Sequence, residues 1–277
     1  MISKKDIYVF DERHRILLTA KEFICLRPHP NLQAYISNYN ITFPTKDIMP
    51  EGFTIMPSGC STLTISHDNN NFFLDLDGPT TKPYIVGGQA NQPAMIVTIE
   101  FKPAGLYALT GINQSELTDI TTPLEAINQK LTKSISIIVE KSASVHELVT
   151  SLDMLFLTNM YTTCHPQLQQ VFQHILSYAG NTTVKRLSDE IFYSERQLNR
   201  IFNQHVGIST KSFSRLIRIN NAFRLLKKPN NSLAIVSDLT GFHDLSHFIR
   251  DFKLVCGMTP QEYRNNMSDF YINPTKF

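Results

Sequence analysis

The spacing of apolar residues divides the chain into a first half of mixed character and a second half of short helices. In the first half, STLTIS at 61–66 and AMIVTIEF at 94–101 have the length and β-branched composition of strands. From about residue 115 the pattern becomes helical, and apolar residues recur at helical spacing at Val145, Leu148, Leu152, Leu155 and Phe156. These residues fit either a core or a dimer surface. The sequence predicts an α+β domain over residues 1–165, with a small mixed or antiparallel sheet plus helices.

The second half, residues 166–277, shows no strand pattern and predicts an all-α domain. PQLQQVFQHILSYAG is a helix that ends at Gly180, a common helix terminator. The long stretch KSFSRLIRINNAFRLLKK has apolar residues along one side and predicts a helix at about 210–227. Shorter helical patterns lie on both sides of it.

Two of these shorter patterns form an internal repeat. LNRIFNQHVG at 198–207 and FIRDFKLVCG at 248–257 match at an offset of fifty residues, while the segments before them match at forty-nine. The extra residue of the second copy falls between Phe242 and Phe248, where a turn is expected. A length difference confined to a turn is typical of two copies of one supersecondary unit.

Each copy has the pattern of a helix, a tight turn and a second helix. Ser194 and Asp244 stand where the N-caps of the second helices belong, and Gly241 suits a turn. The inward-facing residues of the first helices are expected to be Val184, Leu187 and Ile191 in one copy and Leu233, Val236 and Leu239 in the other. The sequence predicts helix-turn-helix units at about 182–205 and 232–255, a motif whose second helix lies in the major groove of DNA.

An arginine occupies the same place in both second helices. Leu198 and Phe202 are four residues apart and face the core, so Arg200 lies about 200° around the helix and points outward. The planar guanidinium suits two-pronged contacts to guanine or phosphate, although a single exposed arginine is usually just solvated. The predicted base-contacting residues are Arg196, Asn199, Arg200, Ser246, Ile249 and Arg250. The predicted phosphate contacts are Lys185, Lys211, Arg215, Arg218 and Lys253.

Charge and cysteine usage agree with this interpretation. The net charge is +2, but residues 1–165 carry 12 Lys and Arg against 16 Asp and Glu (−4), and residues 166–277 carry 14 against 8 (+6). A basic module next to an acidic body favours a polyanionic partner. The four scattered cysteines, together with no secretory signal and no run of about 18 apolar residues, predict a cytoplasmic protein without a membrane segment.

Residues 170–265 resemble the DNA-binding domain of the AraC/XylS transcriptional regulators. The resemblance is carried by SERQLNRIFNQHVGIS and GFHDLSHFIRDFKLVCGMTPQEYR. It implies seven helices, two helix-turn-helix units, base-contacting helices at 194–203 and 244–253, promoter DNA as partner, and activation of transcription through RNA polymerase. Ser188 and Ser237 stand where the family usually has alanine, and Phe192 replaces a common turn glycine.

The first half is similar to an uncharacterised domain that precedes this DNA-binding module. RPHPNLQAYISNYN, MPSGCSTLTIS and IEFKPAGLYALTGINQSELTD carry that likeness, which implies no known ligand. We expect this domain to sense a small-molecule effector or to form a homodimer.

The sequence gives little support for an enzyme active site or a metal site. HDLSH at 243–247 imitates the zinc-protease pattern HExxH, but its acid is aspartate, it lacks a third ligand, and it falls inside the repeat. We expect neither catalysis nor a cofactor. The alternative to a DNA-binding regulator is a ligand-binding or interaction module whose helical domain has lost DNA binding because Phe192 disturbs the turn.

Overall fold

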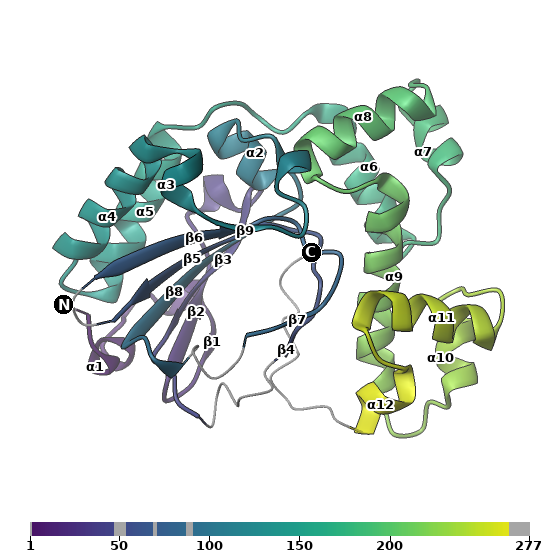
Figure 1. Ribbon diagram of the computed structural model, residues 1–277, viewed down its shortest axis with the longest axis horizontal. Coiled ribbons are helices and arrows are strands. Elements are labelled where there is room, and N and C mark those ends of the chain that lie inside the picture. The colour runs from purple at the N-terminus through teal and green to yellow at the C-terminus, as the bar shows by residue number, and fades with distance from the viewer. Residues whose placement is uncertain (1, 47–53, 69–70, 87–90, 266–277) are drawn as a thin grey trace.

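The computed structural model describes residues 2–46, 54–68, 71–86 and 91–265, which form a sheet-containing part followed by a helical part (Figure 1). The sheet-containing part ends with helix α5 (Val145–Thr158), and the helical part begins with α6 (Pro166–Ser177). Residues 159–165 join the two without forming a helix or strand. The predicted α+β and all-α classes of the two halves are confirmed.

One antiparallel sheet has the strand order β1-β2-β3-β8-β5-β6-β9, and β4 (Thr54–Ile55) and β7 (Tyr84–Ile85) form a separate pair. The sheet has more strands than the sequence predicted. Among the strands that were not expected, β3 buries side chains on both faces and so lacks alternation. Its strands are β1 (Ile16–Thr19), β2 (Phe23–Leu26), β3 (Ile36–Thr42), β5 (Thr62–His67), β6 (Phe72–Asp77), β8 (Met95–Phe101) and β9 (Thr121–Pro123).

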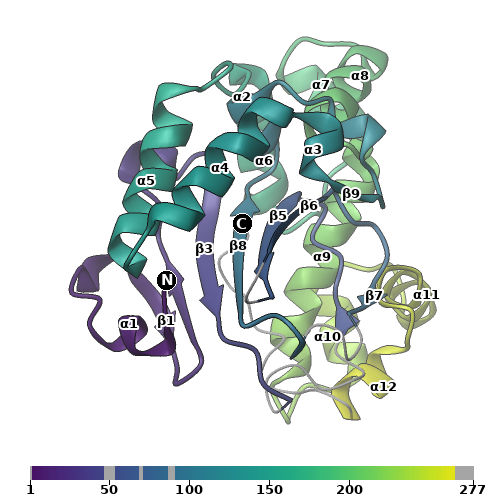
Figure 2. The ribbon, with the colours of Figure 1, turned by 60° about the vertical axis from the view of Figure 1, so that its left-hand side comes forward.

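Helices α4 (Gln129–Lys141) and α5 cover one face of this sheet (Figure 2). Leu148, Leu152 and Phe156 of α5 are buried, and the Phe156 ring meets Phe101 of β8 edge-on at 6.1 Å between centroids. The core interpretation of the apolar stripe at 145–158 is therefore confirmed. The remaining helices of this part are α1 (Lys4–Tyr8), α2 (Gly105–Thr110) and α3 (Leu124–Ile127), with short 3₁₀ turns that include Gln114–Glu116.

A buried carboxylate joins α5 to the first strands. Asp153 accepts hydrogen bonds from the Arg15 guanidinium at 2.7 Å, the Tyr39 hydroxyl at 2.9 Å and the His29 backbone N–H at 3.0 Å. Burial, with Asp153 beside it, raises the pKa of Tyr39 well above its ordinary value. A buried charge is tolerated only when it is paired and hydrogen-bonded, so this network fixes the N-terminal segment against α5.

The helical part consists of α6, α7 (Val184–Glu190), α8 (Glu195–Val206), α9 (Thr210–Leu226), α10 (Leu233–Leu239), α11 (Leu245–Cys256) and α12 (Pro260–Asn265). Helices α7–α8 and α10–α11 form the two expected units, with α9 between them. Phe202 of α8 packs on Phe213 near the start of α9 at 5.5 Å, and Phe252 of α11 packs on Phe223 near its end at 5.6 Å. Each unit is thus attached to one end of the same helix.

The prediction that Leu239 faces inward is wrong. Leu239 is 59% exposed, whereas Thr240 beside it is fully buried. Val236 and Thr240 are four residues apart, so both lie on the inward side at the C-terminal end of α10. Leu239 then lies on the outer side. The forty-nine-residue offset also pairs Thr240, and not Leu239, with the buried Ile191 of the first unit.

The two parts of the molecule meet where α8 ends. Gly207 has a positive φ of 88°, and a Cβ there would lie 2.6 Å from Cγ of Pro79. The Tyr107 ring packs against His205 with 3.9 Å between ring centroids and a tilt of 35°, and Gln204 Nε2 donates to the Tyr107 hydroxyl at 3.1 Å. A Cβ at Gly257, which ends α11, would lie 3.3 Å from Pro83.

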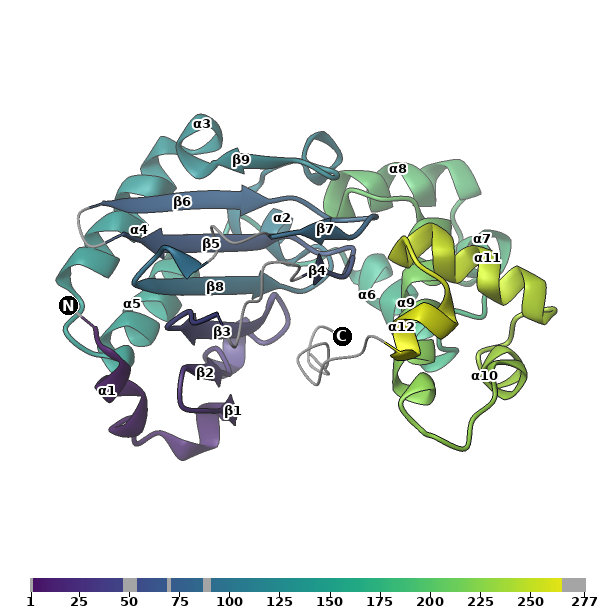
Figure 3. The same ribbon diagram turned by 60° about the horizontal axis from the view of Figure 1, so that its bottom comes forward.

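Helices α8 and α11 therefore both direct their C-terminal ends toward the sheet-containing part (Figure 3). None of the helices within the described ranges has both the length and the apolarity needed to cross a bilayer.

Candidate nucleic-acid interface

Helix α8 presents polar side chains outward from a buried apolar side. Ser194 caps its first turn by accepting from the Gln197 backbone N–H at 3.2 Å, and the Gln197 side chain accepts from the Ser194 N–H in return. Leu198 and Phe202 are fully buried. Arg196 and Arg200 are exposed and Asn199 is half-buried. The outward orientation predicted for Arg200 is what the structure has.

Helix α11 repeats this arrangement. Asp244 accepts from the His247 backbone N–H at 2.6 Å, and this bond is the main cause of the lowered pKa of Asp244. Phe248 and Phe252 are fully buried. Ser246 and Arg250 are exposed, and Ile249 is half-buried. The two units therefore expose an arginine at the same position of the repeat.

The turns between the helices have the same backbone conformation in both units, although their residues differ. Gly241 has φ +71° and Phe192 has φ +57°, so both adopt the left-handed conformation. That conformation costs a non-glycine residue roughly 1–2 kcal/mol. The Phe192 side chain is 94% exposed and so does not disturb the packing of the unit. The substitution of the usual glycine leaves the turn geometry intact.

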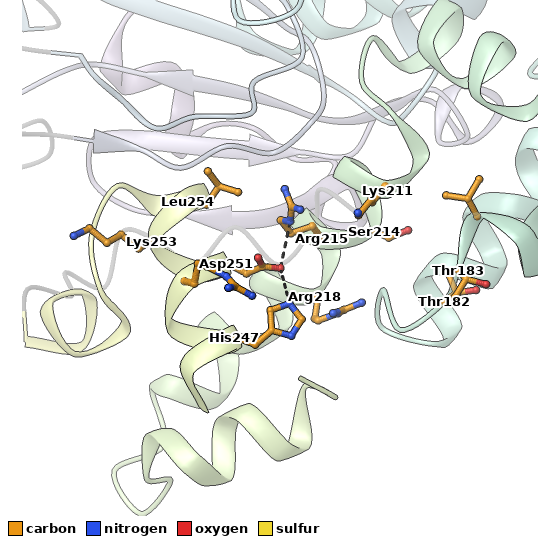
Figure 4. A pocket seen from close by; sticks show the side chains of 12 residues that line it. Thr182, Thr183, Lys211, Ser214, Arg215, Arg218, His247, Asp251, Lys253 and Leu254 are labelled. Carbon is orange, nitrogen blue, oxygen red and sulfur yellow. Dashed lines mark ion pairs between the residues drawn. The ribbon is translucent and has the colours of Figure 1, made fainter. Parts of the chain in front are cut away.

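A cleft of about 920 Å³ lies between the two units and alongside α9 (Figure 4). It is strongly basic and also contains one acidic residue, Asp251. The residues that line it are Thr182, Thr183, Val184, Lys211, Ser214, Arg215, Arg218, His247, Arg250, Asp251, Lys253 and Leu254. Four of the five predicted phosphate contacts, together with Arg250, therefore lie around one depression.

The five predicted phosphate contacts differ in solvent exposure and in whether they already have a partner within the protein. Lys185, Lys211 and Lys253 are exposed. Arg215 is half-buried and pairs with Asp251 at 3.3 Å. Arg218 donates to the Gly180 carbonyl at 2.9 Å, and burial lowers its pKa. The lysines extend into solvent, whereas both arginines already have partners within the protein.

Sequence reasoning missed Asp251, which is 9% exposed and lies next to Arg250. Its carboxylate is 3.3 Å from Arg215 and 3.5 Å from Nε2 of His247, as the dashed lines in Figure 4 show. The available signal was the four-residue spacing of His247 and Asp251, which places them on the same side of a helix. The carboxylate joins α9 to α11 and neutralises part of the cleft's charge.

The histidines of HDLSH do not converge with a third ligand. His243 pairs with Asp244, while His247 faces Asp251. Among the described residues, no group of three histidine, cysteine or acidic side chains is placed to hold a metal ion. All four cysteines are buried, and burial raises the pKa of Cys164 to about 11 and that of Cys25 to about 12.

Comparison with known families finds two separate matches along the chain. A helix-turn-helix domain family matches residues 187–266, and a domain of unknown function, DUF6597, matches residues 25–123. The helix-turn-helix match covers α8, α9 and the second unit and begins within α7.

Curated relatives match the C-terminal region. An uncharacterized HTH-type transcriptional regulator, YisR of Bacillus subtilis, is 30% identical over 91 residues, which are 33% of this chain and 32% of YisR. The HTH-type transcriptional activator RhaR of Yersinia pseudotuberculosis is 33% identical over 82 residues, 30% of this chain and 28% of RhaR. The matches thus span about a third of the length of these relatives.

A solved structure, that of ToxT from Vibrio cholerae, aligns over 83% of this chain and 93% of its own, with 14% identity and a TM-score of 0.42. The family match, the named relatives and the repeated units all concern the same hundred residues. The chain therefore carries, over residues 187–266, a helix-turn-helix domain of the AraC/XylS type.

Proposed function

We propose that this protein is a sequence-specific DNA-binding transcription regulator that contacts two adjacent major grooves with α8 and α11. The observation that carries the proposal is the pair of exposed arginines, Arg200 and Arg250, at the same position of two repeated helices. These helices are attached to opposite ends of α9, which at 17 residues is about 25 Å long. Successive major grooves on one side of DNA are about 34 Å apart, a distance that two helices so attached can match.

The base contacts in this proposal come from Arg196, Asn199 and Arg200 in the first unit and Ser246, Ile249 and Arg250 in the second. Exposed Lys185, Lys211 and Lys253 contact phosphates, while Arg215 and Arg218 add positive charge to the cleft. Ile249 can contact only a thymine methyl group, so the second unit discriminates bases less through polar contacts. Phosphate contacts position the protein, and base contacts give sequence preference.

The sheet-containing part acts in this proposal as the regulatory domain, and the division falls near residue 165. Its contacts with the end of α8 offer a route by which a small-molecule effector or a second copy of the chain could change DNA binding. RhaR carries the name of an activator. By analogy we propose activation of transcription, with RNA polymerase as partner, in the cytoplasm and without a catalytic role.

The test uses the full chain with Arg200→Ala and Arg250→Ala, and with Arg224→Ala as a control on the exposed end of α9. DNA fragments enriched from the genome by the wild type serve as probes in gel shifts at fixed salt. Each of the first two variants should weaken specific binding by about 1–3 kcal/mol, because a base contact is lost while the fold is kept. Arg224→Ala should bind like the wild type.

Unchanged affinity in both arginine variants would refute the base-contacting role. Failure of the wild type to enrich any fragment would instead favour the alternative of an interaction module without DNA binding. The intact turn at Phe192 removes the structural reason for that alternative.

A further inference from the structure

The turn that leads into the first helix-turn-helix unit also contacts the second unit. Gly180 has φ +81°, and a Cβ there would lie 2.2 Å from the Ser214 carbonyl oxygen, so this turn packs directly on the backbone of α9. The neighbouring Asn181 donates from Nδ2 to the carbonyl oxygen of Thr240 at 3.0 Å. Thr240 lies in the turn between α10 and α11. One side chain therefore links the entry of the first unit to the turn of the second.

Arg218 of α9 makes a second link at the same place. Its guanidinium donates to the Gly180 carbonyl at 2.9 Å and lies 5.0 Å from the centre of the Phe242 ring. Phe242 is buried and packs on Phe248 of α11 at 5.2 Å. A cation over an aromatic ring and a charge-assisted hydrogen bond are both directional, and partial burial strengthens both. Figure 4 shows Arg218 extending across the cleft toward Thr182 and Thr183.

These links complement the apolar packing of the second unit. Phe223 near the end of α9 stacks on Tyr263 at 4.7 Å and meets Phe252 edge-on, which holds the second unit to α9. These pairs lie near the end of α9, whereas the turn before α7 packs on Ser214 near its start. The Arg215–Asp251 pair joins α9 to α11 but does not reach the turn before α7. Asn181 and Arg218 join all three pieces, namely the entry turn, the linker helix and the second unit.

We propose that Asn181 and Arg218 form a brace that fixes the separation and rotation of α8 relative to α11, and so determine which spacing between two half-sites the protein accepts. This inference rests on the proposed function. Inserting one base pair between half-sites moves the second by about 3.4 Å and turns it by about 34°. A braced pair of units cannot follow that change without losing contacts, whereas an unbraced pair can adjust by bending at the Phe242 turn.

The experiment starts by selecting duplexes from a random DNA library with the full-length wild type. The selected site is then remade with one base pair inserted or deleted between its halves, and also as a single half-site. Asn181→Ala and Arg218→Lys are compared with the wild type. The lysine keeps the charge but cannot donate in the same fork geometry. Arg224→Ala is the control on α9, and thermal unfolding shows that each variant is folded.

For the wild type, a one-base-pair insertion should reduce affinity about 100-fold, since it removes base contacts worth 1–3 kcal/mol per position. For Asn181→Ala and Arg218→Lys the reduction should be about 10-fold or less, and Asn181→Ala should keep the wild-type affinity for the single half-site. Arg224→Ala should discriminate as the wild type does. Because the two substitutions remove different links of the brace, misfolding of one variant leaves the other as a test.

Three outcomes would overturn the brace. Wild-type spacing discrimination in both variants would show that the links do not set the spacing. Equal loss of affinity at every spacing for Arg218→Lys, with a weaker salt dependence and no effect of Asn181→Ala, would make Arg218 a phosphate contact only. If the wild type enriches no sequence at all, the proposed function fails and this inference with it.

Discussion

The contact between the sheet-containing part and α8 should weaken in acid, because it contains a histidine that is buried in its neutral form. The His205 ring packs against Tyr107 with 3.9 Å between ring centroids, and its centroid lies 6.3 Å from that of His165. Burial, with a smaller contribution from His165, lowers the pKa of His205 from 6.5 to about 4. A histidine whose pKa is lower in the folded protein stabilises the fold above pH 6.5. That stability is lost as the pH falls toward 4.

The size of the effect follows from the pKa. A fall from 6.5 to about 4 is worth about 3 kcal/mol when fully expressed, and about 2 kcal/mol of it is lost by pH 5. The ring also borders a solvent-accessible groove shared with Tyr161 and His165. Solvent screening there reduces the expected loss to about 1 kcal/mol.

Urea unfolding of the wild type and of His205→Phe at pH 7.5 and pH 5.0 measures this loss. Phenylalanine keeps an aromatic ring against Tyr107 but cannot be protonated. The wild type should lose about 1 kcal/mol more than the variant over this range, while the other histidines contribute equally to both. Limited proteolysis within residues 159–165 should also become faster at pH 5 in the wild type alone. Identical pH dependence of the two proteins would refute a neutral His205 as the cause.

Two further predictions concern the departures from the family pattern. Ser237 is 1% exposed and its hydroxyl has no hydrogen-bond partner among the described residues, so Ser237→Ala should raise the free energy of unfolding by about 1 kcal/mol. The control is Ser188→Ala, which removes a hydroxyl that donates to the Lys185 carbonyl at 2.8 Å and should change the free energy of unfolding by less than about 0.5 kcal/mol. Thermal unfolding measures both variants, and equal effects at the two positions would contradict this reasoning. Phe192→Gly should stabilise by about 0.5 kcal/mol, because relief of the left-handed strain exceeds the entropy that glycine gains in the unfolded chain. A loss of stability would mean that the exposed ring has a packing role.

The repeat and the helix-turn-helix units could be predicted from the sequence because they depend on local patterns. Helical periodicity identified the inward sides of α8 and α11. Ser194 and Asp244 indicated where these helices start, and each forms the expected cap. The wrong prediction for Leu239 could also have been corrected from the sequence, because the forty-nine-residue offset pairs Thr240 with the inward residue Ile191.

The N-terminal sheet was only partly predictable. β5 and β8 have recognisable strand composition, whereas β1, β2 and β3 were not expected as strands. β3 is buried on both faces, so its side chains show no alternation that periodicity could detect. The ion network of Arg15, Tyr39 and Asp153 joins residues more than a hundred positions apart, a separation at which sequence spacing carries no information.

By itself, the sequence determined that a basic domain with two copies of one helical unit exposes an arginine from each, because residue spacing on a helix fixes which side chains face outward. Only the tertiary structure decided what those units contact: Asp251 against Arg215 and His247, Asn181 and Arg218 against the second unit's turn, and Tyr107 against His205. Such contacts depend on the packing of elements distant in the chain. The helices orient the arginines, and the packing between the units and the sheet-containing part decides where those helices lie.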